Sequence, residues 1–544
     1  MMKSKKSNKT KSFPDFETVK DIVIYGAVNG ADKKQFMYTD LNRNVATKTF
    51  AEVWYDASGM GQYLYSKGMR NKKVAILGEN SYYWIACYYA MVTGRIVAVP
   101  LDPKLPADDL ADILIRSGCE GLVYSDDFAR EIELFKQNAE VPVKEYIRMD
   151  DVENIAKLGH AQVENGAENY LDDEVLPDDL AFIVYTSGTT GKSKGVMLTQ
   201  NNVAADVTAT CRVMYAENFI AFLPFHHCFS WGSALFASCV FTEWGYICPS
   251  LRTLENDIKD YHPQNFSAVP LAVETIYKKI WYTAKKQGKE EILKKGLKIS
   301  KLLMKFGIDI RRKIFKEVID NLGGNLELII CGGAYLDPKY EQGLTDLGIQ
   351  IINGYGISEC SPIVTVNRID NCKFGSAGLP IPCNEVKINE PNSDGVGEIY
   401  VRGSNVMKGY YNDPEATAEA FDGEWFKTGD FGRLDEDGFL FFVGRKKNLI
   451  VLSNGKNVSP EELEDKLVSI DYVKEVVVYG ENDLITAEFF LDTNMEPDAK
   501  QKIKADVNEL NKKLPGYKRI NKIKTRDTEF PKTTTLKIRR NYKN

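Results

Sequence analysis

Short runs of β-branched residues alternate with helical patterns over the first 350 residues of the chain. Strand-like runs occupy residues 74–77, 95–100, 121–124, 326–331 and 349–352, and helix-like stretches occupy residues 81–93 and 109–117. Buried strands separated by helical segments are typical of a parallel sheet covered by helices. The chain therefore predicts an α/β fold built of layered subdomains.

The pattern changes after about residue 375. Turn dipeptides become frequent, and residues 398–401 and 439–443 between them read as antiparallel strands or hairpins. We expect a small β-barrel-like part there. After Gly444 comes a helix from residue 460, strands at 473–479 and 484–491, and another helix. We predict a disordered basic N-terminus (1–13), a large domain (14–444) and a small α+β C-terminal domain (445–544).

Composition limits the class of protein. The 544 residues carry 70 Lys+Arg against 76 Asp+Glu, so the net charge of -6 gives no general reason to expect a nucleic-acid binder. The ten cysteines show no CxxC pair, which argues against a disulfide scaffold or a zinc site and favours buried thiols in a reducing cytosol. We find neither a secretory h-region nor an apolar run of about 18–20 residues, so we expect a cytoplasmic protein, with peripheral membrane contact left open. The Lys-rich amphipathic stretch at 290–321 predicts helices with a solvated charged face.

A glycine-rich loop follows the strand-like run at residues 182–186. Glycine lets the backbone turn its N–H groups toward an anion, Ser and Thr hydroxyls add donors, and Lys194 adds charge. This chemistry predicts a polyphosphate-binding loop, although a plain Ser/Gly turn has a similar composition. It is not a Walker A loop, because Thr186 stands where that motif requires glycine.

The order of residues 185–195, Tyr-Thr-Ser-Gly-Thr-Thr-Gly-x-x-Lys-Gly, resembles the phosphate-loop motif of the adenylate-forming superfamily. That superfamily includes acyl-CoA synthetases, adenylation domains of peptide synthetases and luciferases. Similar motifs follow in the same order, with Ser358 replacing the usual Thr: residues 331–336, 353–359, 397–403, 409–412, 425–430, 444–447 and 531–537. The resemblance covers residues 49–540 and implies a small C-terminal domain that swings between two poses.

The resemblance also implies roles in binding ATP and AMP. A carboxylate must meet the α-phosphate, so cations and N–H donors must neutralise both anions. Glu359 and Thr186 would bind Mg²⁺, and Asp430 and Arg445 would contact the ribose, although Asp430 alone would also suit a turn. The remaining nucleotide-binding candidates lie around the phosphates and the adenine: Ser187, Gly188, Thr189, Thr190, Lys194, Gly333, Ala334, Asn353, Tyr355, Gly356 and Ser358.

The C-terminal motifs imply three further roles. Lys537 matches the lysine that contacts the carboxylate and the α-phosphate during adenylation, although Leu536 replaces the usual Gly and Lys532 lies nearby. Lys447 matches the hinge. Gly455 and Lys456 would face the pantetheine of CoA in the thioester-forming pose.

Only four histidines occur in the chain, and two of them are adjacent, at His226 and His227. The segment Leu223-Pro-Phe-His-His-Cys228 resembles the family's Pro-x-Phe-His motif, which makes His227 the candidate beside the substrate carboxylate. Metal ligation and core packing are the other readings of the pair. Trp231 is a candidate gate of an acyl pocket, because some long-chain members carry an aromatic residue at that spacing.

The sequence as a whole predicts an ATP-dependent acyl-CoA synthetase, a ligase that forms a carbon–sulfur bond. The cofactors and co-substrates would be ATP, Mg²⁺ and CoA. The motif Gly455-Lys-Asn-Val-x-Pro-Glu-Glu462 and the Lys-rich insert resemble long-chain members, and apolar neighbours of His227 suit either an alkyl chain or plain core packing. We therefore expect a medium- or long-chain fatty acid as the substrate. The alternatives are an enzyme that loads a carrier protein and a non-catalytic nucleotide-binding paralogue.

Overall fold

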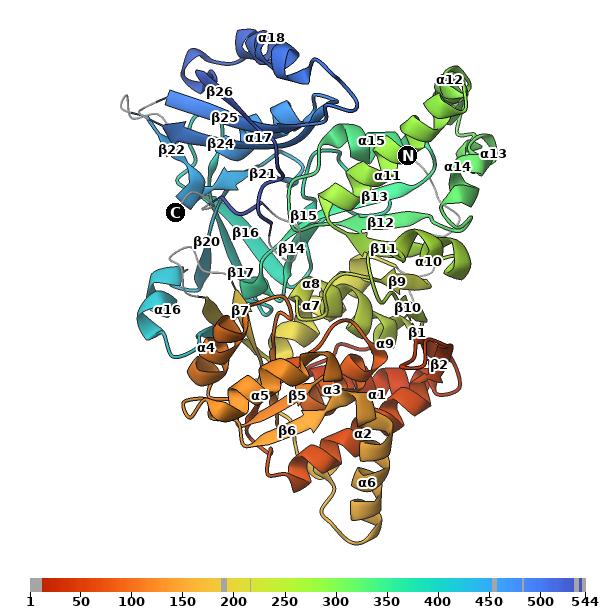
Figure 1. The fold of residues 1–544 in the computed structure, drawn as a ribbon, viewed down its shortest axis with the longest axis vertical. Coiled ribbons are helices and arrows are strands. Elements are labelled where there is room, and N and C mark those ends of the chain that lie inside the picture. Colours follow the sequence, from red (N-terminus) through yellow and green to blue (C-terminus); the bar gives the residue numbers. More distant parts are fainter. Residues whose placement is uncertain are drawn as a thin grey trace.

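The computed structural model describes residues 12–186, 193–215, 217–452, 457–481, 484–532 and 538–540. Two large sheets with their helices build the N-terminal part, an antiparallel sheet follows, and a small three-stranded sheet with two long helices lies at the C-terminal end (Figure 1). This mixed α/β architecture, with a large N-terminal and a smaller C-terminal part, confirms the predicted fold class.

The first large sheet has seven strands. Their order is β18 (Gly409–Tyr410), β8 (Lys194–Thr199), β7 (Leu180–Thr186), β4 (Val97–Pro100), β3 (Lys73–Leu77), β5 (Gly121–Tyr124) and β6 (Glu145–Arg148). Strands β7 to β6 run parallel, whereas β8 returns antiparallel to β7. Five helices belong to this part: α2 (Phe50–Ser66), α3 (Tyr82–Val92), α4 (Ala107–Ser117), α5 (Ala129–Gln137) and α6 (Val152–Glu164). Every residue of α3 is buried, which explains its continuous apolar pattern.

The second large sheet has nine strands. Their order is β15 (Leu379–Pro380), β14 (Ile363–Val366), β13 (Gln350–Gly356), β12 (Leu328–Cys331), β11 (Asn265–Ala268), β9 (Phe219–Ala221), β10 (Gly245–Ile247), β1 (Lys34–Thr39) and β2 (Val45–Thr49). The strands from β13 to β1 are parallel. The helices of this part include α1 (Val19–Gly30), α7 (Gln200–Val213), α10 (Leu254–Tyr261), α11 (Pro270–Lys286) and α15 (Pro338–Asp346).

The Lys-rich stretch is helical, as predicted. It forms α12 (Glu290–Met304), α13 (Arg311–Ile314) and α14 (Lys316–Asn321), which lie at the periphery of the molecule in Figure 1.

The antiparallel strands after residue 375 form a five-stranded sheet. Its order is β16 (Asn384–Asn389), β17 (Gly397–Gly403), β20 (Trp425–Leu434) and β19 (Phe421–Asp422), and β21 (Leu440–Arg445) also pairs with β20. The C-terminal part contains α17 (Pro460–Val468), α18 (Ala499–Lys513) and the strands β24 (Val473–Glu481), β25 (Leu484–Leu491) and β26 (Lys522–Arg526). Its apolar residues, from Ile450 to Ile520, form a hydrophobic cluster of their own. The domain boundary at residues 444–445 stays a prediction.

The structure also shows the state of the cysteines and whether any helix could span a membrane. All ten cysteines are free, and eight of them are buried. Among the described residues, no helix combines the length and apolar character needed to cross a bilayer.

Candidate active site

The predicted site residues follow the carboxyl ends of parallel strands in both large sheets. Thr186 ends β7 in the first sheet, Gly333 follows β12, and Tyr355 lies near the end of β13 in the second. In parallel α/β sheets, ligands bind outside the carboxyl ends of the strands, because the connecting loops gather there. This topology explains why motifs far apart in the sequence meet.

The phosphate loop connects two paired strands. Thr186 and Lys194 are cross-strand partners at the loop end of the β7–β8 hairpin. Ser187, Gly188, Thr189 and Thr190 lie outside the described residues. The two ends of the loop are thus held in a fixed register by the sheet.

Tyr410 links Lys194, the predicted phosphate-binding lysine, to Glu359, the predicted metal-binding carboxylate. The Lys194 Nζ atom lies 4.7 Å from the centre of the Tyr410 ring, and the Tyr410 hydroxyl donates a hydrogen bond to Glu359 Oε1 at 3.0 Å. Burial raises the pKa of the Glu359 carboxyl, whereas the hydrogen bond from Tyr410 lowers it. Lys194 and Glu359, 165 positions apart in the sequence, therefore contact the ring and the hydroxyl of the same tyrosine.

The turn that carries Glu359 is tightly packed. A Cβ at Gly356 would lie 2.3 Å from the Pro362 carbonyl oxygen, so only glycine fits there. Cys228 Sγ donates to Ser358 Oγ at 3.5 Å, which connects this turn to the segment that carries His227.

A buried polar cluster holds the turn that carries Glu359 through hydrogen bonds to its backbone. Asp206 Oδ1 accepts hydrogen bonds from the backbone N–H of Ile363 at 2.9 Å and from Asn405 Nδ2 at 3.1 Å. Asn405 Nδ2 also lies 2.8 Å from the Cys360 carbonyl oxygen. Burial raises the pKa of Asp206 well above its usual range. The sequence reasoning missed this cluster, since neither residue belongs to a motif.

The predicted ribose site is a connected set of three side chains. The Tyr355 hydroxyl donates to Asp430 Oδ2 at 2.8 Å, and Arg445 Nε lies 3.5 Å from Asp430 Oδ1. Asp430 and Arg445 are cross-strand partners on β20 and β21. Asp430 is buried, whereas the Arg445 side chain is about half exposed. Burial raises the pKa of the Tyr355 hydroxyl far above its usual range, so it remains a donor.

The residues predicted to lie along the edge of the adenine include an exposed stretch of backbone and one buried hydrogen-bond acceptor. Gly333 has a φ of +87°, and Gly333 and Ala334 are both exposed after β12. Asn353 is buried; its Nδ2 donates weakly to the Ser376 carbonyl at 3.4 Å, and within the described part of the chain its Oδ1 has no hydrogen-bond partner. An unsatisfied buried acceptor is costly, and a donor such as an adenine amino group would satisfy it.

The residues fit a magnesium ion that arrives with ATP. Across the described ranges, no group of three or more His, Cys, Asp or Glu side chains gathers into a protein metal site. Mg²⁺ usually binds one or two carboxylates and completes its shell with water and substrate phosphates. Glu359, whose Oε1 accepts from the Tyr410 hydroxyl, supplies a carboxylate, and Thr186 supplies a hydroxyl at the end of β7.

The histidine pair lies on a segment held by the first sheet. Asn80, which follows β3, donates from Nδ2 to the Leu223 carbonyl and accepts from the Phe225 N–H through Oδ1, both at 2.8 Å. His226 Nε2 lies 3.6 Å from Asp102 Oδ1, and burial lowers the pKa of His226 to about 4. His226 is therefore a neutral packing residue at neutral pH, while the partly exposed His227 precedes the short helix α8 (Cys228–Ser230).

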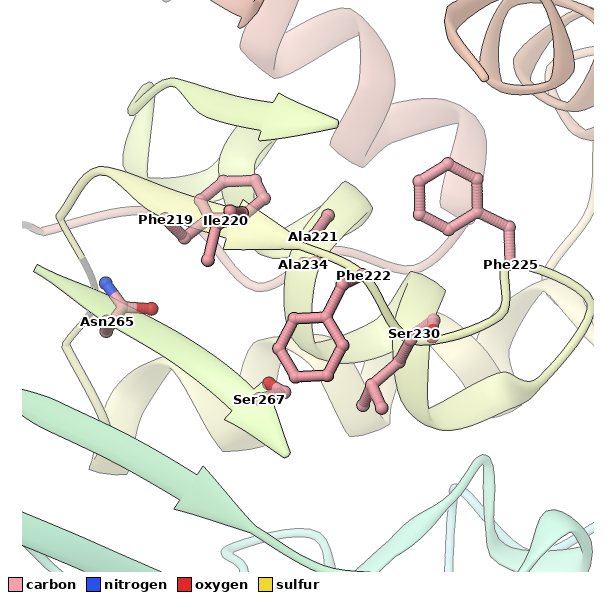
Figure 2. A pocket seen from close by; sticks show the side chains of 10 residues that line it. Phe219, Ile220, Ala221, Phe222, Phe225, Ser230, Ala234, Asn265 and Ser267 are labelled. Carbon is pink, nitrogen blue, oxygen red and sulfur yellow. The ribbon is translucent and has the colours of Figure 1, made fainter. Parts of the chain in front are cut away.

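Trp231 does not line the apolar pocket that its neighbours Ser230 and Ala234 help to form. Trp231 is fully buried and stacks on Phe182, with ring centres 5.0 Å apart. The pocket is lined by Phe222, Leu223, Phe225 and seven neighbours from β9, β11 and residues 230–234, and Trp231 is not among them. Figure 2 shows the Phe222 ring beside Ser267 of β11 and Ser230. In this conformation Trp231 packs in the core.

The C-terminal candidates are described only in part. Lys447 lies in the 3₁₀ turn Lys446–Asn448 directly after β21, where the chain leaves the antiparallel sheet. Gly455, Lys456 and Lys537 lie outside the described residues. Lys532 Nζ pairs with Glu475 Oε1 at 2.5 Å and with Glu529 Oε2 at 2.8 Å. These ion pairs give Lys532 a structural role in the small sheet.

The comparisons with known proteins agree with this arrangement. The family described as AMP-binding enzyme matches residues 27–411, and the AMP-binding enzyme C-terminal domain matches residues 447–543. Long-chain-fatty-acid–CoA ligase 6 of Homo sapiens is 31% identical over 451 residues, covering 76% of this chain and 65% of that protein. Fatty acyl-CoA synthetase A of Dictyostelium discoideum is 29% identical, covering 80% of this chain and 70% of that protein. The chain thus spans about two thirds of the length of these relatives, and 64% of the ligase 6 of Mus musculus.

Solved structures share the fold over nearly the whole chain. The anthranilate CoA ligase in complex with anthranoyl-AMP has a TM-score of 0.77 at 20% identity and covers 97% of both chains. The o-succinylbenzoate CoA synthetase of Bacillus subtilis in complex with its acyl-adenylate has a TM-score of 0.73 at 23% identity, covering 96% of this chain and 97% of that chain. With both family matches in sequence order and the fold shared, the chain belongs to the AMP-binding enzyme family.

Proposed function

We propose that this protein is an ATP-dependent acyl-CoA synthetase. A carboxylate attacks the α-phosphorus of ATP, and pyrophosphate leaves. The thiol of CoA then attacks the carbonyl carbon of the acyl-adenylate, which gives a thioester and AMP. The observation that carries the proposal is the convergence of Lys194, Tyr410 and Glu359 beside the Tyr355–Asp430–Arg445 set.

The first half-reaction needs positive charge around two anions. The β7–β8 hairpin would hold the β- and γ-phosphates, with Lys194 at its end. Mg²⁺ on Glu359 would supply charge on the phosphate oxygens, and Asp430 would accept from the ribose hydroxyls. Because Asp430 is held from two sides by Tyr355 and Arg445, it is already oriented before the nucleotide binds.

The acid is proposed to be a medium- or long-chain fatty acid. The small cavity beside the His227 segment is walled by Phe219, Phe222, Leu223 and Phe225, with Ser230, Asn265 and Ser267 as its polar members, and it would have to widen to admit an alkyl chain. Each methylene that leaves water for such a surface gains about 0.8 kcal/mol. Several relatives are named long-chain-fatty-acid–CoA ligases, which agrees with this substrate class. His227 would then lie beside the carboxylate.

The second half-reaction is proposed to use the small domain. Residues 445–544 would turn about Lys447, so that Lys537 serves adenylation in one pose and Gly455 and Lys456 approach pantetheine in the other. A short turn that leaves a sheet, such as residues 446–448, concentrates a change of φ and ψ in few residues.

Pyrophosphate release across acids of increasing chain length tests the proposal, with CoA, an acyl carrier protein or no acceptor present. We expect turnover with CoA that improves from short to long chains. Turnover only with the carrier protein would make the chain a carrier-loading enzyme. Release with none of the acids would make it a nucleotide-binding paralogue.

A further inference from the structure

Helix α12 and the turn that follows it expose a stripe of large apolar side chains. The exposed fractions are 68% for Ile292, 54% for Ile299, 57% for Leu302 and 73% for Phe306. The spacing of 7, 3 and 4 residues places them along one helical face. The opposite face packs inward through Leu293 and Ser300.

Lysines border this stripe. Residues 285–313 contain eleven lysine and arginine residues against three acidic ones, although the whole chain has a net charge of -6. Lys294 and Lys301 form ion pairs with Glu290 and Asp346. Lys295 and Lys298 on α12 and Lys305 in the turn that follows it are exposed and have no ion pair within the described part of the chain. The positive charge is thus locally uncompensated.

An exposed apolar stripe beside unpaired lysines matches one kind of surface. A helix that lies in a membrane interface buries its apolar face among the acyl chains, and its lysines pair with anionic headgroups. An acidic protein surface would use the lysines but would leave Ile292, Ile299 and Phe306 in water. We propose that α12 with residues 305–308 docks this protein on an anionic lipid bilayer. The helices α12–α14 lie at the periphery of the molecule in Figure 1, where a flat surface can reach them.

Vesicle flotation with the full chain tests this docking surface. The vesicles are pure phosphatidylcholine, or phosphatidylcholine with about one third phosphatidylserine. We expect binding to the anionic vesicles that falls with added salt and is much weaker on the neutral ones. A basic residue near an anionic surface contributes about fivefold in affinity, so replacing Lys295, Lys298 and Lys305 by Gln should weaken binding roughly a hundredfold. Replacing Ile299, Leu302 and Phe306 by Ser should weaken it by at least about tenfold.

Two control variants separate docking from general effects. The first removes the same charge elsewhere, with Gln at Lys157, Lys504 and Lys513. The second removes exposed apolar side chains elsewhere, with Ser at Val28, Leu41 and Leu158. Both controls should bind like the wild type, and all four variants should keep wild-type circular dichroism and pyrophosphate release with a water-soluble acid.

Three outcomes would overturn the docking proposal. They are equal binding to neutral and anionic vesicles, wild-type binding by both α12 variants, and no binding by the wild type. Analytical ultracentrifugation adds a fourth: a dimer lost only in the Ser variant would assign the stripe to a second copy of the chain. Because binding is measured without substrate, failure of this proposal is independent of the proposed activity.

Discussion

The hydroxyl of Tyr355 donates to Asp430 Oδ2 at 2.8 Å in a buried setting. This hydrogen bond joins β13 of the nine-stranded sheet to β20 of the antiparallel sheet. A carboxylate has about four acceptor positions. Tyr355 donates to Oδ2 and Arg445 lies near Oδ1, so both carboxylate oxygens are oriented by neighbouring side chains. The link therefore stabilises the fold and orients the proposed nucleotide contact at once.

Tyr355→Phe removes this donor and leaves the ring in place. We expect the KM for ATP to rise, because Asp430 loses one of the groups that orient it, and the free energy of unfolding to fall by about 1–3 kcal/mol. Steady-state kinetics and urea unfolding measure both effects. Tyr340→Phe is the matched control, since the Tyr340 hydroxyl is buried without a hydrogen-bond partner in the described residues. Equal effects in the two variants would contradict the assigned role.

Tyr410→Phe keeps the aromatic face under Lys194 but removes the hydrogen bond to Glu359. Because that bond lowers the pKa of Glu359, its loss raises the pKa. The carboxyl then stays protonated to a higher pH and binds Mg²⁺ less well there. The acidic limb of the pH profile of pyrophosphate release should move upward, and more Mg²⁺ should partly restore activity. Tyr411→Phe is the control, and an unshifted profile in Tyr410→Phe would argue against the link.

Glu341 gives a pH dependence of stability that needs no substrate. It is fully buried on α15, its Oε2 accepts from the Gly375 N–H at 3.0 Å, and burial raises its pKa to about 7. Between its ordinary pKa and about 7, the folded chain binds more protons than the unfolded chain. Its contribution to stability is therefore full at low pH and is lost as the pH rises through 7.

Glu341→Gln keeps an acceptor for Gly375 and cannot ionise. At pH 8 the variant should be more stable than the wild type by on the order of 3 kcal/mol, and at pH 5 the gain should shrink to about 1 kcal/mol or less. Urea unfolding at the two pH values measures this difference. Glu436→Gln, at an exposed position, should show no such dependence. A gain that is the same at both pH values would mean that ionisation is not its cause.

Lys537 and Lys532 should behave differently when each is replaced by Ala. Lys537→Ala should abolish pyrophosphate release but still convert supplied acyl-adenylate to acyl-CoA. Lys532→Ala should keep both half-reactions and lose about 1–3 kcal/mol of stability, because the buried Glu475 loses its ion pair and keeps only the hydrogen bond from the Phe530 N–H. Separate assays of the two half-reactions measure this contrast. Normal overall turnover in Lys537→Ala would refute its proposed role.

The sequence predicted the helices and strands of this fold better than the contacts between residues that are far apart in the chain. The strands β3, β5 and β25 and the Lys-rich helices were predicted because apolar periodicity is local. The contact of Tyr410 with both Lys194 and Glu359 depends on β18 pairing with β8, which no local pattern encodes. The Asp206–Asn405 cluster and the two hydrogen bonds of Asn80 to the segment before His226 were missed for the same reason. Trp231 was predicted as a pocket gate from its resemblance to long-chain members with an aromatic residue at that spacing, whereas its stacking on Phe182 depends on tertiary packing.

The central claim is that these side chains activate a fatty acid for transfer to CoA. Its most direct test is product analysis by mass spectrometry after incubation with palmitate, ATP, Mg²⁺ and CoA. The account predicts palmitoyl-CoA, AMP and pyrophosphate in equal amounts, with palmitoyl-AMP when CoA is left out. ADP and phosphate as the products, or no acyl-AMP from any acid between two and eighteen carbons long, would contradict it.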